Sequence, residues 1–501
     1  MSIPPESSPA TPAAADAPAR SRWLALYVLC AAMLMIVLDG TIVNVALPSI
    51  QDDLGFTQSD LAWVVNAYMI PFGGLLLLAG RLGDLLGQRR VFLVGLAVFT
   101  LASLLCAVSW SQAMLVGARF VQGAGGALAS AVVLGMIVTM FPEPREQAKA
   151  LGVYGFVASA GGSIGLLAGG VLTEAISWHW IFMINLPIGA AVTLLALRLV
   201  PARPGLGLAR GADFPGAALI TASLMLGVFT ILQVTEWGWT AGRTLLLGAV
   251  AVALLAAFLA RQARVANPLM PLRLFRSRNV AGANALQSLL VAGMFGMFFL
   301  GALYMQRVLG YSPLQVGLAF LPASVVMGLL SLGLSERLIM RFGPRRTLIP
   351  GVSAVVVALL LFARTPVDGS FAVDLLPPFM LIAVGVGTSF PAIMTVAMSG
   401  ATPSESGLAS GLVNTSMQVG GAIGLAVLAT LSTDRTEAQL ADGASPAEAL
   451  VSGFHLAYLI GAALAAAAVA IAVLVLRDPE AHRGRGSEAP ESADAPLPEA
   501  G

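Results

Sequence analysis

The chain has 501 residues, of which 57% are hydrophobic and 11% are charged, and its mean hydropathy is +0.87. Soluble domains carry about 25% charged residues, so this composition excludes a soluble cytosolic enzyme. The net charge of +1 leaves no basic excess for binding nucleic acid. Cys30 and Cys106 lie in apolar runs and the chain has only 3 histidines, so we expect neither a disulfide framework nor a metal site.

Fourteen apolar stretches are each long enough to cross a membrane as a helix, for which roughly 20 residues are needed. The predicted spans are 23–47, 61–80, 91–110, 112–141, 148–173, 179–199, 214–235, 242–260, 281–305, 313–335, 346–363, 374–399, 407–431 and 453–476. The longest predicted connections, 200–213, 265–280 and 432–452, have no room for a folded soluble domain. The sequence therefore predicts an all-α multi-pass membrane protein with fourteen transmembrane helices.

The two ends of the chain differ from this pattern. Residues 1–22 and 477–501 are rich in proline, alanine and serine, and we expect both to be disordered tails. If the first tail is cytoplasmic, 22 of the 27 basic residues fall on that side and four on the other. This agrees with the positive-inside rule. We therefore expect both termini in the cytoplasm and the spans in the cell (inner) membrane.

Two pairs of similar segments within the chain indicate a duplication. The segments 80–90 and 336–346, aligned on Gly87 and Gly343, share arginine, leucine, glycine and a closing Arg-Arg at an offset of 256. The segments from Pro142 and from Pro403 repeat at an offset of 261. Although short arginine-rich turns can recur by chance, two similar offsets favour six-helix halves, 23–199 and 281–476, separated by two inserted helices within 200–280. Parallel repeats of this kind place a substrate site between the halves.

Two charged residues stand out inside the spans, Asp39 in the first and Arg119 in the fourth. Burying an ionisable group in hydrocarbon costs about 2.5 kcal/mol or more. At 1.5 Å per residue both lie roughly 11–12 Å inside the outer boundary, so we expect a buried pair or a shared cavity. A carboxyl group that meets water from either side in turn can bind and release a proton, which makes Asp39 a candidate proton carrier. A salt bridge that only locks two helices is the alternative.

Small and polar residues follow helical spacing around this pair. Arg119, Gln122, Gly123 and Gly126 share one face of the fourth span. In the fifth span Gly161, Gly165 and Gly169 form two small-xxx-small steps, which allow close helix packing. Together with Gly170 they are the candidate packing residues.

Two enzymatic interpretations are disfavoured. Residues 161–165 match the G-x-S-x-G pattern of hydrolases, but no predicted strand precedes them and no histidine is near. The only lysine, Lys149, lies outside any phosphate-binding loop, so the chain cannot hydrolyse ATP in that way. We expect no enzyme activity.

The segment 80–90 has a physical interpretation of its own. Gly80, Gly83 and Gly87 predict a tight turn, Asp84 can accept hydrogen bonds from a helix N-terminus, and Arg89 and Arg90 can hold the turn at the interface. The segment is a candidate latch between the halves, and a simple positive-inside anchor is the alternative.

At these residues the sequence resembles the major facilitator superfamily, and within it the fourteen-helix drug:proton antiporter (EmrB/QacA-type) branch. The resemblance rests on residues 38–48 in the first span, 80–90 in the following connection, 119–126 in the fourth span and 178–187 at the entry to the sixth. It implies secondary active transport, with proton-coupled export of lipophilic drugs or toxic compounds by alternating access. It also implies a proton-transfer role for Arg119 and no cofactor beyond the proton gradient.

Three departures from the family pattern affect this expectation. Gly165-Leu166 precedes Gly169-Gly170 where the family has Gly-Pro, although the glycine face remains. His179 stands where arginine is usual. The C-terminal half has no deeply placed carboxylate, because Glu336 and Asp374 lie at span ends. We therefore expect a low proton:substrate ratio and neutral or singly charged lipophilic substrates.

The expected cavity between the halves has apolar and adaptable candidates for its wall, since methionine side chains are flexible and polarizable. The candidates are Asn44, Met69, Phe72, Gln122, Gln287, Met294, Met297, Phe298, Tyr304, Asn414 and Gln418. The expected partners are the lipid bilayer, a small lipophilic substrate and protons. The sequence does not indicate whether a periplasmic adaptor is needed. A transporter of the same fold for a physiological substrate, such as a lipid, siderophore, peptide or the cell's own antibiotic, is the alternative function.

Overall fold

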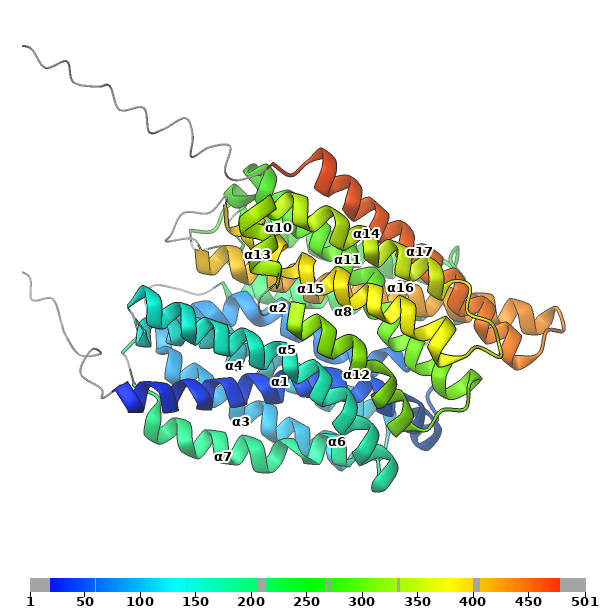
Figure 1. The fold of residues 1–501 in the computed structure, drawn as a ribbon, viewed down its shortest axis with the longest axis horizontal. Helices are drawn as coiled ribbons and strands as arrows, with labels where there is room; N and C mark the ends of the chain where they lie inside the picture. Colours follow the sequence, from blue (N-terminus) through cyan, green and yellow to red (C-terminus); the bar gives the residue numbers. More distant parts are fainter. Residues whose placement is uncertain are drawn as a thin grey trace, which may run out of the picture.

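The computed structural model describes residues 19–477, apart from 59, 142, 203, 206, 208–212, 267, 271, 331–333 and 400–405. Within these residues the regular structure is helical and no strand occurs. Long helices lie side by side along one direction (Figure 1). Twelve of them are long and apolar enough to cross a membrane. This confirms the prediction of an all-helical membrane protein.

The first group of helices covers the N-terminal part of the chain. Here α1 packs against α5 and α7, and α4 packs against α2 and α3. Phe99 and Phe182 are fully buried inside the group. Its helices are α1 (Ala19–Leu54), α2 (Ala62–Leu86), α3 (Gln88–Ala107), α4 (Gln112–Met140), α5 (Pro144–Ala175), α6 (Trp180–Met183) and α7 (Asn185–Leu199).

The second group covers the C-terminal part. Here α11 packs against α16 and α17, and α14 packs against α15 and α17. Phe320, Phe362 and Phe379 are buried against one another in its interior. Its elements are α11 (Arg278–Leu303), the π-helical turn η3 (Tyr304–Val308), α12 (Pro313–Leu329), α13 (Ser335–Phe342), α14 (Pro344–Phe362), the π-helical turn η5 (Phe371–Leu375), α15 (Leu376–Ser399), α16 (Ser406–Ala441) and α17 (Pro446–Leu474).

The helices between the groups connect them in space as well as in sequence. The helix α8 (Phe214–Leu232) contacts both α2 and α16, and α10 (Gly242–Gln262) packs on α8. The short helix α9 (Val234–Trp237) joins these two, and the 3-10 turn η2 (Leu272–Arg276) follows α10. The two groups also meet directly through α2 with α16 and α5 with α12.

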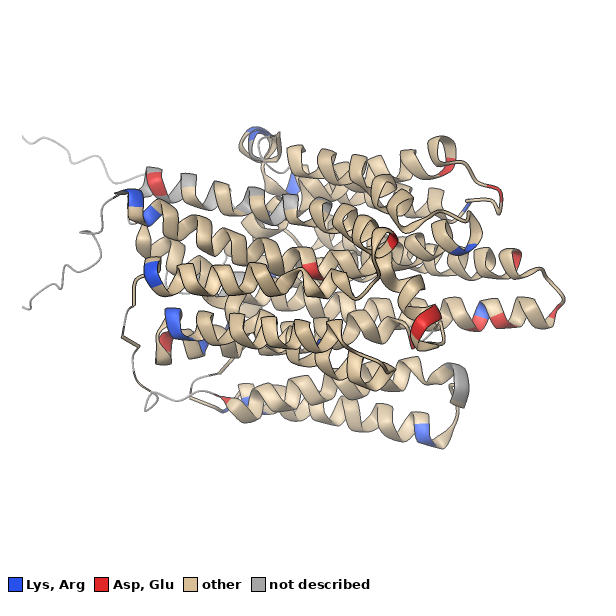
Figure 2. Cartoon of the chain, turned by 90° about the horizontal axis from the view of Figure 1, so that it is seen from below, with Lys and Arg blue, Asp and Glu red and all other residues tan. Residues whose placement is uncertain are grey.

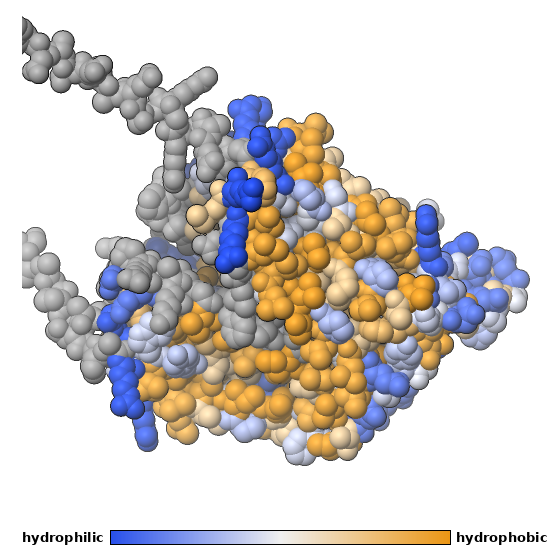
Figure 3. All heavy atoms as spheres, viewed as in Figure 1, coloured by the Kyte–Doolittle hydropathy of each residue, from blue (hydrophilic) through white to orange (hydrophobic). Residues whose placement is uncertain are grey.

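The beginning of α1 and the end of α17 lie at the same end of the molecule, on the left in Figure 1. We call this the terminus-side end and the other the opposite end. Charged residues gather near both ends while the middle of the helices is almost free of them (Figure 2). Hydrophobic residues cover most of the visible face between the ends (Figure 3). This distribution suits helices that span a bilayer.

Several predicted boundaries need correction. The segment 432–452 is mostly helix, because α16 continues to Ala441 and α17 already begins at Pro446. Ser445 caps α17 in a capping box with Glu448, so this polar helix end is stable outside the apolar stretch. The predicted span 179–199 is interrupted between α6 and α7 at Ile184.

Two other predicted spans, 148–173 and 313–335, correspond to α5 and α12, which are not among the twelve. The apolar parts found in them are the shorter helices Ile164–Ala175 and Pro313–Leu329. The end of the predicted span 313–335 includes residues 331–333, which lie outside the described residues.

The similar segments 80–90 and 336–346 have a similar backbone conformation at their aligned glycines. Gly87 joins α2 to α3 with φ 96°, and Gly343 joins α13 to α14 with φ 85°. Glycine adopts such positive φ values without the cost paid by other residues. The predicted turn is wrong in its extent, because Gly80 and Gly83 belong to α2 and only Gly87 breaks the helix. The second pair of similar segments starts at Pro142 and Pro403, which lie outside the described residues.

Candidate functional site

Asp39 of α1 and Arg119 of α4 form a direct ion pair. Arg119 Nη1 donates to Asp39 Oδ2 at 2.5 Å, and both side chains are completely buried. A buried charge is tolerated when it is paired and its remaining atoms are hydrogen-bonded. The structure thus brings together the two charged residues that the sequence singled out, at one depth in the first group.

Uncharged polar side chains complete the surroundings of Asp39. Its Oδ1 atom accepts hydrogen bonds of 2.8 Å from Gln122 of α4 and of 2.8 Å from Asn185 of α7. Both amides also donate to Ser103 Oγ of α3, at 3.2 and 2.9 Å. All three residues are buried. Four helices therefore hold one carboxylate in a closed polar network.

The guanidinium group of Arg119 is fixed from several sides. Its Nε atom donates to the carbonyl of Val64 at 3.0 Å, and Nη1 also donates to Gln122 Oε1 at 2.8 Å. Its central carbon lies 4.3 Å from the ring centroid of Tyr68 and 5.6 Å from that of Phe182. Such cation–π contacts stabilise a desolvated cation.

Sequence reasoning missed Ser103, Asn185 and Tyr68. Asn185 lies in the segment 178–187 that was used for the family resemblance, so a signal for it existed. Ser103 and Tyr68 are single polar residues in apolar runs, and nothing in their spacing distinguishes them.

Glycines of α5 place α1, and with it Asp39. A Cβ atom at Gly165 would lie 2.1 Å from Thr41 Oγ1 and 2.9 Å from the carbonyl of Leu38, and one at Gly169 would lie 2.6 Å from the carbonyl of Ile42. At Gly161 the nearest atom would be 3.0 Å away, in Val37. The two helices therefore approach backbone to backbone next to the carboxylate.

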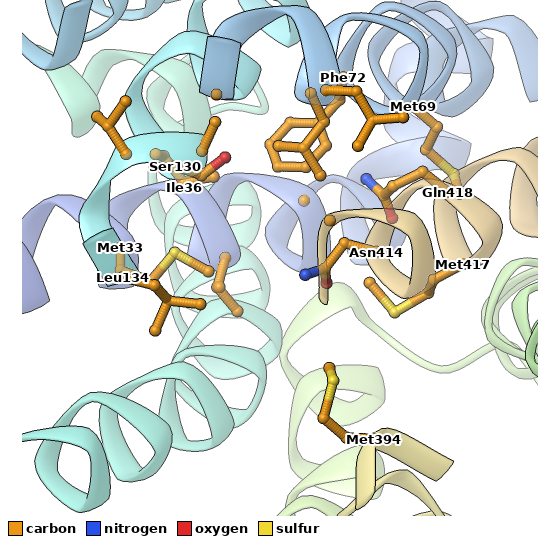
Figure 4. A pocket seen from close by; sticks show the side chains of 18 of the residues that line it. Met33, Ile36, Met69, Phe72, Ser130, Leu134, Met394, Asn414, Met417 and Gln418 are labelled. Atoms are coloured by element: carbon orange, nitrogen blue, oxygen red, sulfur yellow. The ribbon is translucent and has the colours of Figure 1, made fainter. Parts of the chain in front are cut away.

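A cavity of about 1890 Å³ lies between the two groups of helices. At its deep end Tyr68 and Arg119 line the wall, and at the terminus-side end Asp84 and Thr139 line it. Methionines 33, 69, 394 and 417 stand around this space together with Asn414 and Gln418 (Figure 4). The connection after α10 and η2 lines the mouth, where it supplies Arg273 and Arg276.

The structure divides the predicted cavity residues into two sets. Those on the wall are Asn44, Met69, Phe72, Met294, Phe298, Asn414 and Gln418. It does not place Gln122, Gln287, Met297 or Tyr304 there. Gln122 belongs to the Asp39 network, Gln287 and Met297 are buried in α11, and Tyr304 donates to the carbonyl of Pro366 at 2.6 Å. Tyr304 of η3 faces the second group, where its ring lies 6.5 Å from that of Phe454 in α17.

At the opposite end the two groups are in contact. Glu174 Oε2 of α5 accepts hydrogen bonds from Ser312 Oγ at 2.6 Å and from the backbone N–H of Leu314 at 3.0 Å. A Cβ atom at Gly170 would lie 2.6 Å from the carbonyl of Pro313. Gly170, predicted as a packing residue, thus packs α5 against α12 of the other group.

Side chains of η3 add to this contact. Gln306 Nε2 donates to the carbonyl of Val45 at 2.9 Å. Arg307 pairs with Asp52 and also donates to the carbonyl of Pro48 at 3.3 Å. Both side chains belong to the second group, and all their acceptors lie on α1.

The segment 80–90 contacts other partners than expected. Asp84 is exposed at the mouth of the cavity, beside Arg81, and accepts no hydrogen bond from the described part of the chain. The predicted hydrogen bonds to a helix N-terminus are therefore wrong for this conformation, since the cavity separates Asp84 from the second group. Arg89 donates to the carbonyl of Leu197, and Arg90 is exposed. The carbonyl of Leu85 accepts from the N–H of Gly207 at 3.0 Å.

A second buried carboxylate fastens the inserted helices. Asp213, directly before α8, accepts from Arg261 Nε and Gln262 Nε2 at 2.6 Å each and from the N–H of Gly216 at 2.9 Å. Burial alone raises the pKa of Asp213, but these hydrogen bonds and the charge of Arg261 outweigh it and bring the pKa below its ordinary value of 3.8. Gln262 Oε1 also accepts from the N–H of Met270, which ties the cavity mouth to the same cluster.

Neither a metal site nor a hydrolase site is found. No group of three or more histidine, cysteine, aspartate or glutamate side chains is arranged to hold a metal ion among the described residues. The segment 161–165 lies inside α5, not after a strand. The geometry instead resembles a transport site, with a buried ion pair beside a cavity between two helical groups.

Comparison with known families decides the class. The family model of the Major Facilitator Superfamily matches residues 29–425. The chain belongs to the major facilitator superfamily. It is therefore a multi-pass membrane transport protein and not an enzyme.

Relatives within the superfamily have names that refer to antibiotics. The chain is 40% identical to the puromycin resistance protein of Streptomyces alboniger over 460 residues, which cover 91% of each chain. It is 39% identical to the cephamycin export protein of Amycolatopsis lactamdurans, over 84% of this chain and 87% of the relative. A tetracenomycin C resistance and export protein of Streptomyces glaucescens is 33% identical over 82% of this chain and 76% of the relative.

Two solved structures of transporters share the fold. A bacterial homolog of the human lysosomal transporter Spinster, in an inward-facing and unoccupied conformation, matches with a TM-score of 0.64 and 15% identity, over 91% of this chain and 97% of the other. A peptide transporter in complex with sulfate matches with a TM-score of 0.65 and 13% identity, over 90% and 95%.

Proposed function

We propose that this major facilitator protein is a proton-coupled antiporter that exports lipophilic compounds by alternating access. The observation that carries the proposal is the buried Asp39–Arg119 pair beside the deep end of the cavity. A carboxylate in this position can bind a proton when the site is exposed to one side and release it when exposed to the other. One elementary charge that crosses 100 mV gains about 2.3 kcal/mol, which is enough to drive export.

The direction in which the cavity faces supports alternating access. The two groups touch at the opposite end through Glu174 and η3, while the cavity extends to the terminus-side end. Release on the far side requires these contacts to break and the terminus-side end to close. The contacts named here join the two groups and not the helices within one group, so exchanging them leaves the packing inside each group intact.

The proposed topology has fourteen spans with both termini in the cytoplasm. It adds α5 and α12 to the twelve candidate helices, since both run alongside them in the bundle (Figure 1). The arginine-rich connections at the terminus-side end support a cytoplasmic assignment by the positive-inside rule. The cavity then faces the cytoplasm, and the protein lies in the cell membrane. The equal geometry of Gly87 and Gly343 supports two duplicated halves.

Antibiotics are the first substrates to test. Two relatives are named for puromycin and cephamycin, and the apolar wall with methionines and a few amides suits such molecules. A physiological substrate of another class, such as a lipid or a siderophore, remains the second candidate that the same wall could hold.

The test is substrate-driven proton movement in proteoliposomes, measured with an internal pH dye for the wild type and Asp39→Asn. Puromycin and a cephamycin are added in turn, and binding is measured separately on the purified protein. We expect Asp39→Asn to lose proton movement and to retain binding. Asp442→Asn, an exposed residue between α16 and α17, is the matched control and should behave as the wild type. Unchanged proton movement in Asp39→Asn would show that Asp39 is not the carrier.

A further inference from the structure

We propose that Arg119 and Tyr68 form an oxygen-anion subsite at the deep end of the cavity. The substrates would then be amphipathic organic anions, in which a carboxylate or phenolate is attached to an apolar ring system. This inference rests on the proposed function, because it names the substrate class for the same cavity. It refines the expectation of neutral or singly charged substrates by giving the sign of the charge, so of the two antibiotics to be tested it favours the cephamycin, a carboxylate, over puromycin, an amine.

The first observation is an unused donor on Arg119. Its Nε and Nη1 atoms are bonded to Val64, Asp39 and Gln122, but Nη2 is buried and makes no hydrogen bond with the described part of the chain. A guanidinium group has five N–H donors, and a buried one without an acceptor costs stability. Arg119 lines the cavity whereas Asp39 does not, so a ligand at the deep end meets Arg119 first.

The second observation is a neighbouring hydroxyl group that is also buried and also lacks a hydrogen-bond partner among the described residues. Tyr68 Oη is buried and has no hydrogen-bond partner among the described residues, and Tyr68 also lines the cavity. Its ring lies against the guanidinium group of Arg119, with 4.3 Å between the central carbon and the ring centroid. Gly126 packs against this side chain, because a Cβ atom there would lie only 3.2 Å from the hydroxyl oxygen. Two adjacent donors without acceptors match an oxygen that carries negative charge.

The charges along the cavity wall point in the same direction. The acidic residue described on the wall is Asp84, and it lies beside Arg81. Arg276 of η2 adds a positive charge at the mouth and is exposed. Positive charge at the mouth of a cleft raises the local concentration of anions there, so Arg276 favours their entry.

The wall between mouth and subsite suits an apolar ring system. Phe72 continues the aromatic surface of Tyr68, with 5.6 Å between ring centroids. Thioether groups make favourable contacts with aromatic rings and adapt to their shape. Figure 4 shows four methionines around the cavity, Met33, Met69, Met394 and Met417, of which Met69 lies next to Phe72.

Because the substrate anion and Asp39 would both bind Arg119, substrate binding is linked to protonation of Asp39. A substrate anion at Nη2 and the carboxylate of Asp39 at Nη1 draw on the same guanidinium charge. Binding at one position therefore alters the free energy of the other, in both directions.

The test compares three probes with one ring system: 4-(1-pyrenyl)butanoate, its methyl ester and 4-(1-pyrenyl)butylamine. Binding to the protein in lipid nanodiscs is measured by energy transfer from tryptophan to pyrene, with empty nanodiscs subtracted and no ion gradient. We expect the acid to bind about tenfold more tightly than the ester, and the amine most weakly. Equal or tighter binding of the ester or the amine overturns the inference, and this comparison needs no variant.

Tyr68→Phe isolates the hydroxyl group, since it keeps the ring over Arg119. It should weaken binding of the acid about tenfold and leave the ester unchanged, which also shows that the variant is folded. Tyr27→Phe, on an exposed part of α1, is the matched control. If the acid binds equally well to Tyr68→Phe and to Tyr27→Phe, the role of Tyr68 is overturned. If proton movement is absent but the acid still binds more tightly and Tyr68→Phe still weakens its binding, the subsite is supported and the proposed antiport is wrong. If proton movement is present but the acid has no preference, only the subsite is wrong.

Discussion

Glu174 at the end of α5 caps the beginning of α12, where Ser312 Oγ donates to its carboxylate at 2.6 Å. A side chain of the first group thus satisfies a helix N-terminus of the second, at the end where the cavity is sealed. Because a negative charge at a helix N-terminus is stabilising, this contact favours the sealed conformation.

Glu174→Ala should therefore shift the protein toward the conformation that opens at the opposite end. The expected change is a few-fold, since Glu174 is exposed to solvent and Ser312 is only half-buried. The measurement is the rate at which Asn44→Cys, on the cavity wall, reacts with a membrane-impermeant maleimide added at that end. Glu437→Ala, an exposed residue of α16, serves as the control. An unchanged rate in Glu174→Ala would mean that other contacts hold the seal.

Removing one member of the Asp39–Arg119 pair should destabilise the protein more than removing both. A buried charge left alone costs about 3–5 kcal/mol, whereas an uncharged pair avoids this penalty. We expect Asp39→Ala to lower the thermal unfolding temperature, and Asp39→Ala combined with Arg119→Gln to recover part of the loss without recovering proton movement. Additive losses would show that the two charges do not depend on each other.

The close approach of α5 to α1 gives a matched pair of glycine variants. Gly165→Ala places a methyl group 2.1 Å from Thr41 Oγ1, whereas a Cβ atom at Gly162 meets nothing within 4 Å. Overpacking of this kind costs about 1–3 kcal/mol, so Gly165→Ala should unfold at lower temperature and Gly162→Ala should not. Adding Thr41→Ala should restore part of the loss. Equal unfolding temperatures of the two glycine variants would contradict the packing described here.

The turns at Gly87 and Gly343 should respond alike to substitution. Their positive φ values cost about 1–2 kcal/mol for alanine, so Gly87→Ala and Gly343→Ala should each lower thermal stability. Gly80→Ala lies inside α2 with no atom within 4 Å of its Cβ, and it should be neutral or stabilising by about 0.5–1 kcal/mol. A loss at Gly80 as large as at Gly87 would favour the longer turn that the sequence predicted.

The Asp213 cluster should stabilise the protein evenly over the physiological pH range. Because the pKa of Asp213 lies below 3.8 in the folded chain, its contribution is fully present above that value and is lost as the pH falls through the folded-state pKa. The difference in stability between the wild type and Asp213→Asn, about 1 kcal/mol, should be constant from about pH 5 to pH 8 and shrink below pH 3.8. A difference that varies between pH 5 and pH 8 would point to another titrating group.

The helices and the ion pair were predictable because their signals are strong in this composition. A single charge within an apolar run is rare, so Asp39 and Arg119 stand out without knowledge of the fold. Uncharged polar residues do not stand out, because many of them bond to their own helix, as Thr100 Oγ1 does to the carbonyl of Leu96 at 2.8 Å. Ser103 could be recognised only once the rotation of α3 against α4 was known.

The remaining errors have similar causes. Met297 of α11 is not on the cavity wall where it was expected, because a helix that is apolar on all sides does not reveal its orientation. The helical ends around 432–452 were missed because hydropathy marks only the part of a helix inside the bilayer. The pattern Ser445-Pro446 with Glu448 is a capping signal that could have located the start of α17.

At the opposite end, several contacts that close the cavity are made to main-chain carbonyl groups and not to side chains. Gln306 donates to the carbonyl of Val45, and Arg307 donates to the carbonyl of Pro48. A carbonyl is supplied by whichever residue occupies the position, provided the helix keeps its path. The inner surface of α1 can therefore vary in sequence, and with it the range of compounds carried, while the barrier against leakage stays intact.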